Sequence, residues 1–176
     1  MRIKQFFRAV TARIFPSDRK YIRQHLPSAG AELFAAMAVH DARHALNTAY
    51  TAEKLAARHK LSLADKNLLI RCALLHDVGR HKGSMGISGK VIAVLAAKIA
   101  PRMARRFAHA EGKFNFLLRR LRQILFVYYE HPQIGADKLE TVGLTREAAL
   151  VRHHHAPPQP GESVILTLLR QSDELN

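Results

Sequence analysis

The sequence predicts an all-α protein that folds as a single domain. Apolar residues recur at helical spacing nearly throughout the chain, and neither an alternating strand pattern of useful length nor an internal repeat is evident. Apolar residues make up 48% of the 176 positions, which is enough for one hydrophobic core at this length. We therefore expect a helical bundle.

Prolines, glycines and capping residues divide the first half of the chain into helices. The first predicted helix has apolar positions at helical spacing, namely Ile3, Phe6, Phe7, Val10 and Ile14. Pro16-Ser17-Asp18 ends it and offers an N-cap to a short second helix, and residues 27–30 form another break. Alanine-rich residues 31–59 then form one long helix or two helices in line. Ser62 caps a helix that runs to about Leu75.

The second half of the chain begins with a glycine-rich loop over residues 79–89. An apolar helix over residues 90–99 follows, and Pro101 interrupts it. Further helices are expected up to Tyr129 and over residues 131–141, 145–155 and 162–175. The proline-rich run at residues 157–161 separates the last two.

The formal net charge of +14 predicts anionic partners, namely nucleic acid, anionic lipid or phosphorylated small molecules. Residues 102–122 are rich in Arg and Lys with interleaved phenylalanines, and such a segment can follow a phosphate backbone and stack bases. We favour the simpler interpretation of an amphipathic helix with its aromatic residues in the core. For the basic N-terminal helix we likewise favour packing against the bundle over peripheral contact with an anionic membrane.

The cysteine content and the N-terminus point to the cytoplasm. The single cysteine, Cys72, cannot form an internal disulfide and lies in an apolar run, so we expect a buried core residue. The N-terminus lacks the continuous apolar segment and cleavage site of a signal peptide. No apolar stretch approaches the ~20 residues that a membrane-spanning helix needs.

Histidines and aspartates supply the candidate site. His76-Asp77 ends an apolar helix, where a histidine nitrogen and two carboxylate oxygens can point into one cavity and bind metal. Such a pair alone would be weak support for a metal site. His44 lies upstream among small residues, however, and Asp173 lies among leucines, where an unpaired carboxylate is costly to bury. Between them along the chain come further histidines, namely His131 and the triplet His153-His154-His155.

Four segments, in the same order, resemble the HD-domain metal-dependent phosphohydrolases. These proteins carry a histidine, a His-Asp pair and a distal aspartate on a helical bundle, and His44, His76-Asp77 and Asp173 match that pattern. CALLHDVGR resembles the ALLHDIGK segment of the family, EHPQIGA resembles HPEIGA, and VRHHHA resembles VRHHHE. The resemblance spans residues 31–176, so residues 1–30 are expected to form an N-terminal helical extension. The match is HDIG-type and lacks the Gly-Tyr-Pro signature of the cyclic-di-GMP hydrolases.

The resemblance implies a set of metal ligands. One ion, from the group Fe, Mn, Co, Ni and Zn, would be bound by His44, His76, Asp77 and Asp173. In two-metal members of the family, a histidine that matches His131 and a pair that matches His154 and His155 serve a second ion. Of that pair we expect His154 to be the ligand, and we interpret His153 as structural or as a support for the ligands.

Neighbouring residues depart from the family pattern. His40 shares a helix face with His44, at a position where relatives that cleave cyclic dinucleotides often carry glutamate. Asp41 is expected to orient the imidazole of His44. Arg80 replaces the usual lysine, and we expect it to act in catalysis with Asp77 by neutralising charge on the transferring phosphoryl group.

The expected function is hydrolysis of a phosphomonoester or phosphodiester by metal-activated water, with a nucleotide as the substrate. The alternative is a catalytically silent HD module that senses a nucleotide or binds nucleic acid. The complete ligand set favours the enzyme, because a silent module does not need every ligand. The sequence does not decide between one ion and two, and it does not set the oligomeric state.

Overall fold

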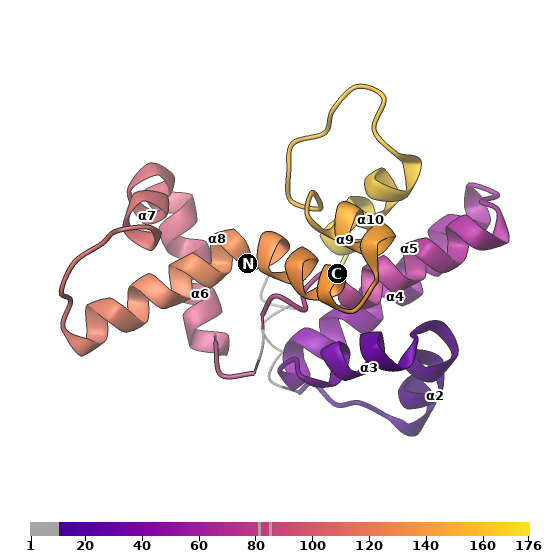
Figure 1. The fold of residues 1–176 in the computed structure, drawn as a ribbon, viewed down its shortest axis with the longest axis horizontal. Coiled ribbons are helices and arrows are strands. Elements are labelled where there is room, and N and C mark those ends of the chain that lie inside the picture. The colour runs from indigo at the N-terminus through magenta and orange to yellow at the C-terminus, as the bar shows by residue number, and fades with distance from the viewer. Residues whose placement is uncertain (1–10, 81, 85) are drawn as a thin grey trace.

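A computed structural model describes residues 11–80, 82–84 and 86–176 of the chain, and these residues form helices and no strand (Figure 1). The predicted all-α class is therefore confirmed. Most of the predicted first helix falls on residues 1–10, outside the described residues. The described helices are α2 (Pro16–His25), α3 (Ser28–Ala35), α4 (Val39–Arg58), α5 (Leu63–Leu75), α6 (Ile87–Ile99), α7 (Pro101–Ala108), α8 (Phe116–Thr141), α9 (Thr145–Val151) and α10 (Val164–Glu174).

The main core lies around α5, which packs against α4, α9 and α10. From Leu68 to Leu75 every residue of α5 except Arg71 is buried, as expected for a helix that is apolar on all sides. Cys72 is among these residues, as predicted. The facing side of α4 carries small residues at helical spacing, which let the two helices approach closely: Ala42, Ala45, Ala49, Ala52 and Ala56.

A second, smaller hydrophobic cluster joins α6, α7 and the first half of α8, which extend to one side of the main core in Figure 1. Phe107 and Phe114 pack edge to face in this part of the chain, with ring centroids 5.5 Å apart. Phe116 and Leu117, however, are 71% and 74% exposed. The prediction that the aromatic residues of segment 102–122 lie in the core was therefore wrong for Phe116, which is exposed at the start of α8.

Several predicted helix boundaries differ from the structure. Of the two alternatives for residues 31–59, two helices are found, and the first of them, α3, already begins at Ser28 within the predicted break. Helices α9 and α10 are shorter than expected, and because α9 ends at Val151, His153, His154 and His155 lie in a turn. The two helices predicted on either side of Glu130 are one helix, because α8 continues through Pro132. Pro132 has no N–H for the carbonyl of Tyr128, and Nδ1 of His131 lies 2.9 Å from that carbonyl oxygen instead. The histidine side chain thus replaces the missing backbone hydrogen bond.

Helix α2 is tied to α4 by Asp18. The carboxylate of Asp18 accepts hydrogen bonds from the backbone N–H of Phe15, at 2.7 Å, and from the hydroxyl of Tyr50, at 2.8 Å, and it pairs with Arg43. Ile22 of the same helix belongs to the main core. The domain boundary at residue 30 stays a prediction. Among the described helices, none has the length and apolarity required to cross a membrane.

Candidate metal centre

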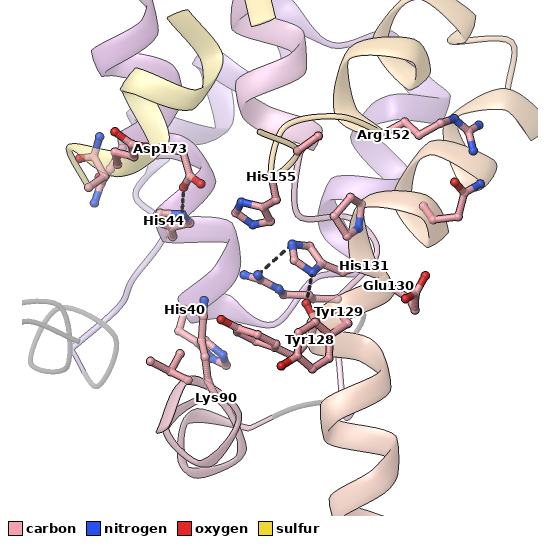
Figure 2. A pocket seen from close by; sticks show the side chains of 18 of the residues that line it. His40, His44, Lys90, Tyr128, Tyr129, Glu130, His131, Arg152, His155 and Asp173 are labelled. Carbon is pink, nitrogen blue, oxygen red and sulfur yellow. Dashed lines mark hydrogen bonds and ion pairs between the residues drawn. The ribbon is translucent and has the colours of Figure 1, made fainter. Parts of the chain in front are cut away.

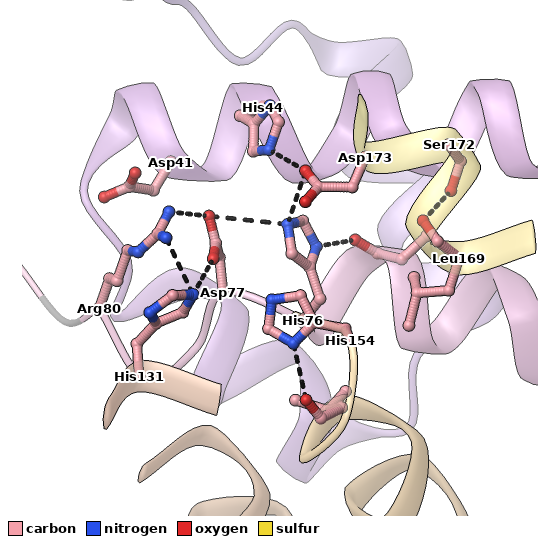
Figure 3. Close-up of polar contacts among 12 residues, drawn as sticks. Asp41, His44, His76, Asp77, Arg80, His131, His154, Leu169, Ser172 and Asp173 are labelled. Atoms are coloured by element: carbon pink, nitrogen blue, oxygen red, sulfur yellow. Dashed lines mark hydrogen bonds and ion pairs between the residues drawn. The ribbon is translucent and has the colours of Figure 1, made fainter. Parts of the chain in front are cut away.

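The predicted ligands come from five parts of the chain and meet at one place (Figure 3). Helix α4 supplies His44, the end of α5 supplies His76 and Asp77, and α10 supplies Asp173. The remaining ligands come from the middle of α8 and from the turn after α9, namely His131 and His154. Residues up to 129 positions apart in sequence are thus brought into contact.

One group of donors surrounds His76. Its Nε2 atom lies 3.6 Å from Oδ2 of Asp77 and 3.5 Å from Oδ1 of Asp173. The same Asp173 oxygen is 2.7 Å from Nε2 of His44. The donor atoms of His44, His76 and Asp77 lie within 4.8 Å of one another, as do those of His76, His154 and Asp173, so these side chains can hold a metal ion.

A second group of donors consists of His131, His154 and His155, which also lie within 4.8 Å of one another. Oδ1 of Asp77 is 3.3 Å from Nε2 of His131, so the carboxylate faces both groups, with one oxygen toward each. Sequence reasoning selected His154 alone from the histidine pair, whereas the structure places both members beside His131. His155 is the more exposed of the two.

Backbone carbonyl groups fix the orientation of three of these imidazoles. Nδ1 of His76 lies 2.9 Å from the carbonyl oxygen of Ala73, and the corresponding distances are 2.9 Å for His131 to Tyr128 and 2.6 Å for His154 to Val151. Ala73 and Val151 are at helix C-termini, where carbonyl groups lack intrahelical partners. When Nδ1–H donates to these carbonyls, the free lone pair of each ring is on Nε2. This tautomer can bind a metal ion through Nε2.

Several donor atoms at the centre are buried and lack a hydrogen-bond partner among the described residues. They are Nε2 of His76, Nε2 of His154 and Oδ1 of Asp77. Leaving such atoms unpaired is costly, and buried polar groups in folded proteins rarely stay so. Because all three are ligand atoms of the predicted centre, a divalent cation is the group that fits them.

The electrostatics of the centre favour bound cations. Burial disfavours a charged His76, yet the nearby carboxylates of Asp77 and Asp173 outweigh it and raise the pKa of His76 to about 9. Burial would raise the pKa of both carboxyl groups, but the cations and histidines around them lower both pKa values. Burial and the Arg80 charge lower the pKa of His131 to about 3, so this ring stays neutral and can ligate a metal.

Two glycines lie where the turn after α5 meets α8 at the centre. A Cβ atom on Gly79 would lie 2.1 Å from the carbonyl oxygen of His131, and one on Gly135 would lie 3.2 Å from the backbone nitrogen of Gly79. The contact at Gly79 requires glycine, and it brings the turn after Asp77 against the helix that carries His131. The glycine of the His-Asp-Val-Gly segment is thus required by backbone packing.

The neighbouring polar residues are only partly as predicted. Arg80 is buried and contacts Asp77 and His131. The expectation that Asp41 orients His44 was wrong, because its carboxylate lies 3.0 Å from Nζ of Lys90 and 3.3 Å from Nε2 of His40. Asp41 therefore links α4 to α6. The side chain of His153 is exposed.

Comparison with protein families matches residues 41–175 to the HD domain, which is more than three quarters of the chain. The chain belongs to the HD-domain family. HD-domain proteins are generally metal-dependent phosphohydrolases that bind divalent metals, and the His and Asp groups of this chain can hold such an ion. Comparison with curated proteins and with solved structures gives no match.

The HD-domain centre opens into a recess of about 960 Å³ (Figure 2). Residues of α4, α6, α7, α8 and α10 line it, and its wall includes Arg80, Lys90 and Arg105 and two half-buried tyrosines, Tyr128 and Tyr129. This volume lies at the upper end of the range of about 300–1,000 Å³ that is usual for small-molecule sites. The recess combines metal ligands, cations and aromatic rings.

Proposed function

We propose that this protein is a metal-dependent phosphohydrolase that cleaves a phosphomonoester or phosphodiester of a nucleotide. The observation that carries the proposal is a pair of buried donor atoms beside the recess, Nε2 of His76 and Oδ1 of Asp77, which lack a hydrogen-bond partner among the described residues. In an HD-domain chain, such donors are best explained as metal ligands.

The proposed ligands of the ion are His44, His76, Asp77 and Asp173. A divalent transition-metal ion bound there would act as a Lewis acid and would lower the pKa of a bound water molecule, which makes it a better nucleophile toward phosphorus. The chain itself supplies orientation, because the carbonyl of Ala73 fixes the ring of His76.

The walls of the recess are suited to a nucleotide. Arg80, Lys90 and Arg105 place positive charge where a phosphate group would lie, although Lys90 is also paired with Asp41. Tyr128 and Tyr129 pack edge to face with centroids 5.1 Å apart, and they offer an apolar surface to a nucleobase. The nucleotide class, like the HDIG subtype, is part of the proposal.

The experiment combines metal analysis with a substrate screen. The purified protein is stripped with a chelator, reloaded with manganese, nickel, cobalt, iron or zinc, and assayed on p-nitrophenyl phosphate, bis-p-nitrophenyl phosphate and nucleotides. Asp77→Asn should lose both bound metal and turnover. Asp137→Asn is the matched control, because Asp137 is exposed on the same α8 helix that carries His131 and pairs with Arg152.

Two results would contradict the proposal. If the loaded parent protein hydrolyses no phosphate ester, the silent-sensor alternative is favoured. If Asp77→Asn binds as much metal as the parent, the donors identified above do not form the metal site.

A further inference from the structure

In Figure 3, Arg80 and His76 lie on opposite sides of Asp77, and both face its Oδ2 atom, whereas Oδ1 faces His131. The Nη1 atom of Arg80 lies 2.6 Å from Oδ2 of Asp77, and its Nη2 atom lies 2.8 Å from Nε2 of His131. Arg80 is only 7% exposed, and the other two residues are 1% exposed. The guanidinium group therefore forms a buried, two-pronged contact with two of the predicted ligands.

This contact uses the one lone pair that His131 can offer to a metal. With the Nδ1–H of His131 donating to the carbonyl of Tyr128, the free lone pair is on Nε2. The guanidinium of Arg80 is a permanent donor with no acceptor capacity, so at 2.8 Å it donates into that lone pair. An ion bound by His131 would need the same lone pair. Arg80 in this position and a second ion therefore exclude each other at His131.

The charge of the centre leads to the same result. The carboxylates that face the clustered histidines are Asp77 and Asp173, while Asp41 is engaged by Lys90. One divalent ion already balances two carboxylates, and Arg80 adds a further positive charge. A second divalent ion would leave this buried centre with three net positive charges. Such an excess is strongly unfavourable in a region of low dielectric constant.

We propose that Arg80 is a built-in second cation, so that the centre holds one metal ion, on His44, His76, Asp77 and Asp173. The inference rests on the proposed function and specifies how its site is built. In two-metal hydrolases the second ion helps to stabilise negative charge on the reacting phosphate. The guanidinium of Arg80 also lines the recess, so it presents a fixed positive charge beside the ion. The planar fork of arginine suits this place, because it reaches Asp77 with one nitrogen and His131 with another, whereas lysine would have to donate to both from a single nitrogen.

The test is the metal content of the full chain, measured by elemental analysis after saturation with Mn²⁺ and removal of free metal. The parent protein should bind one ion per chain. Arg80→Ala frees Nε2 of His131 and removes one positive charge, so it should bind two ions per chain. In Arg80→Ala/His131→Ala the content should return to one. Electron paramagnetic resonance gives a second readout, since only the Arg80→Ala protein should show exchange-coupled manganese.

His131→Ala alone keeps the inference testable if Arg80→Ala does not fold. This variant should still bind one ion per chain, because His131 is not a ligand when Arg80 is in place. If the site held two ions, the content of His131→Ala would fall below that of the parent.

The outcomes separate this inference from the proposed function. Two ions per parent chain with phosphate-ester hydrolysis would overturn the role of Arg80 and leave the function intact. One ion per chain without hydrolysis would support the role of Arg80 and overturn the function. A single ion in the Arg80→Ala protein would overturn the inference, and no bound ion in the parent would overturn both.

Discussion

Replacing Gly79 by alanine places a methyl group in the closest backbone contact of the metal centre. The added Cβ would lie 2.1 Å from the carbonyl oxygen of His131 and 2.8 Å from its carbonyl carbon. Real Cβ atoms essentially never come within 3.0 Å of such atoms, and both partners here are backbone, which cannot rotate away. The turn after α5 and the middle of α8 would therefore have to separate by about 1 Å in a close-packed interior.

We expect Gly79→Ala to lower the free energy of unfolding by about 3 kcal/mol, the upper part of the usual range for overpacking. For a chain of this size, that corresponds to a decrease in Tm of about 6–12 °C. Thermal unfolding of the chelator-treated protein, followed by far-UV circular dichroism, measures the effect without a contribution from bound metal.

Gly86→Ala is the matched control for this substitution. No atom lies within 4 Å of a Cβ built on Gly86, and its φ of −77° is accessible to alanine. Its stability should stay within about 0.5 kcal/mol of the parent. A Gly79→Ala protein as stable as Gly86→Ala would refute the close approach of the turn after α5 to α8.

Three further predictions concern acid stability, thiol reactivity and metal removal. Although burial alone would raise the pKa of Asp18, Arg43 and Tyr50 hold it below the ordinary value of 3.8. Because the pKa of Asp18 is lower in the folded state than in the unfolded state, its carboxylate stabilises the fold at pH values above the ordinary pKa of 3.8. This stabilisation is lost as the pH falls through the folded-state pKa. Urea unfolding should show Asp18→Asn to be about 2 kcal/mol less stable than the parent at neutral pH, with the difference shrinking below about pH 4. Burial raises the pKa of the Cys72 thiol, so iodoacetamide should label it in urea but not in the native protein, as mass spectrometry would show. Metal at 100 times its Kd should stabilise the parent by about 2.7 kcal/mol, and a chelator should reverse the resulting rise in Tm.

The sequence was most informative where one residue type carried a specific chemical requirement. The His-Asp pair, the upstream His44 and the distal Asp173 could be selected because, with their flanking segments, they match the pattern of the HD-domain family. Helix periodicity likewise predicted the all-α class. The proximity of His155 to His131 could not be read in advance, because it depends on α9 ending at Val151.

Other features of the structure depend on contacts that a linear pattern does not encode. Pro132 predicted a break in α8, yet the helix continues because the side chain of His131 forms a hydrogen bond with the carbonyl oxygen of Tyr128. The neighbouring His-Pro pair is a signal for this arrangement, although its meaning requires the helix to be known. Asp41 was assigned to His44 by helical spacing, but Lys90 of a distant helix binds it instead. The two-pronged contact of Arg80 could also not be predicted, since its acceptors, Asp77 and His131, are far apart in the sequence.

Anomalous diffraction from crystals grown with manganese tests the central claim most directly. One anomalous peak should lie among His44, His76, Asp77 and Asp173, at about 2.1 Å from the ligating atoms, with Arg80 still on Asp77 and His131. The absence of a peak at these four side chains, under conditions in which the protein turns over a phosphate ester, would contradict the account.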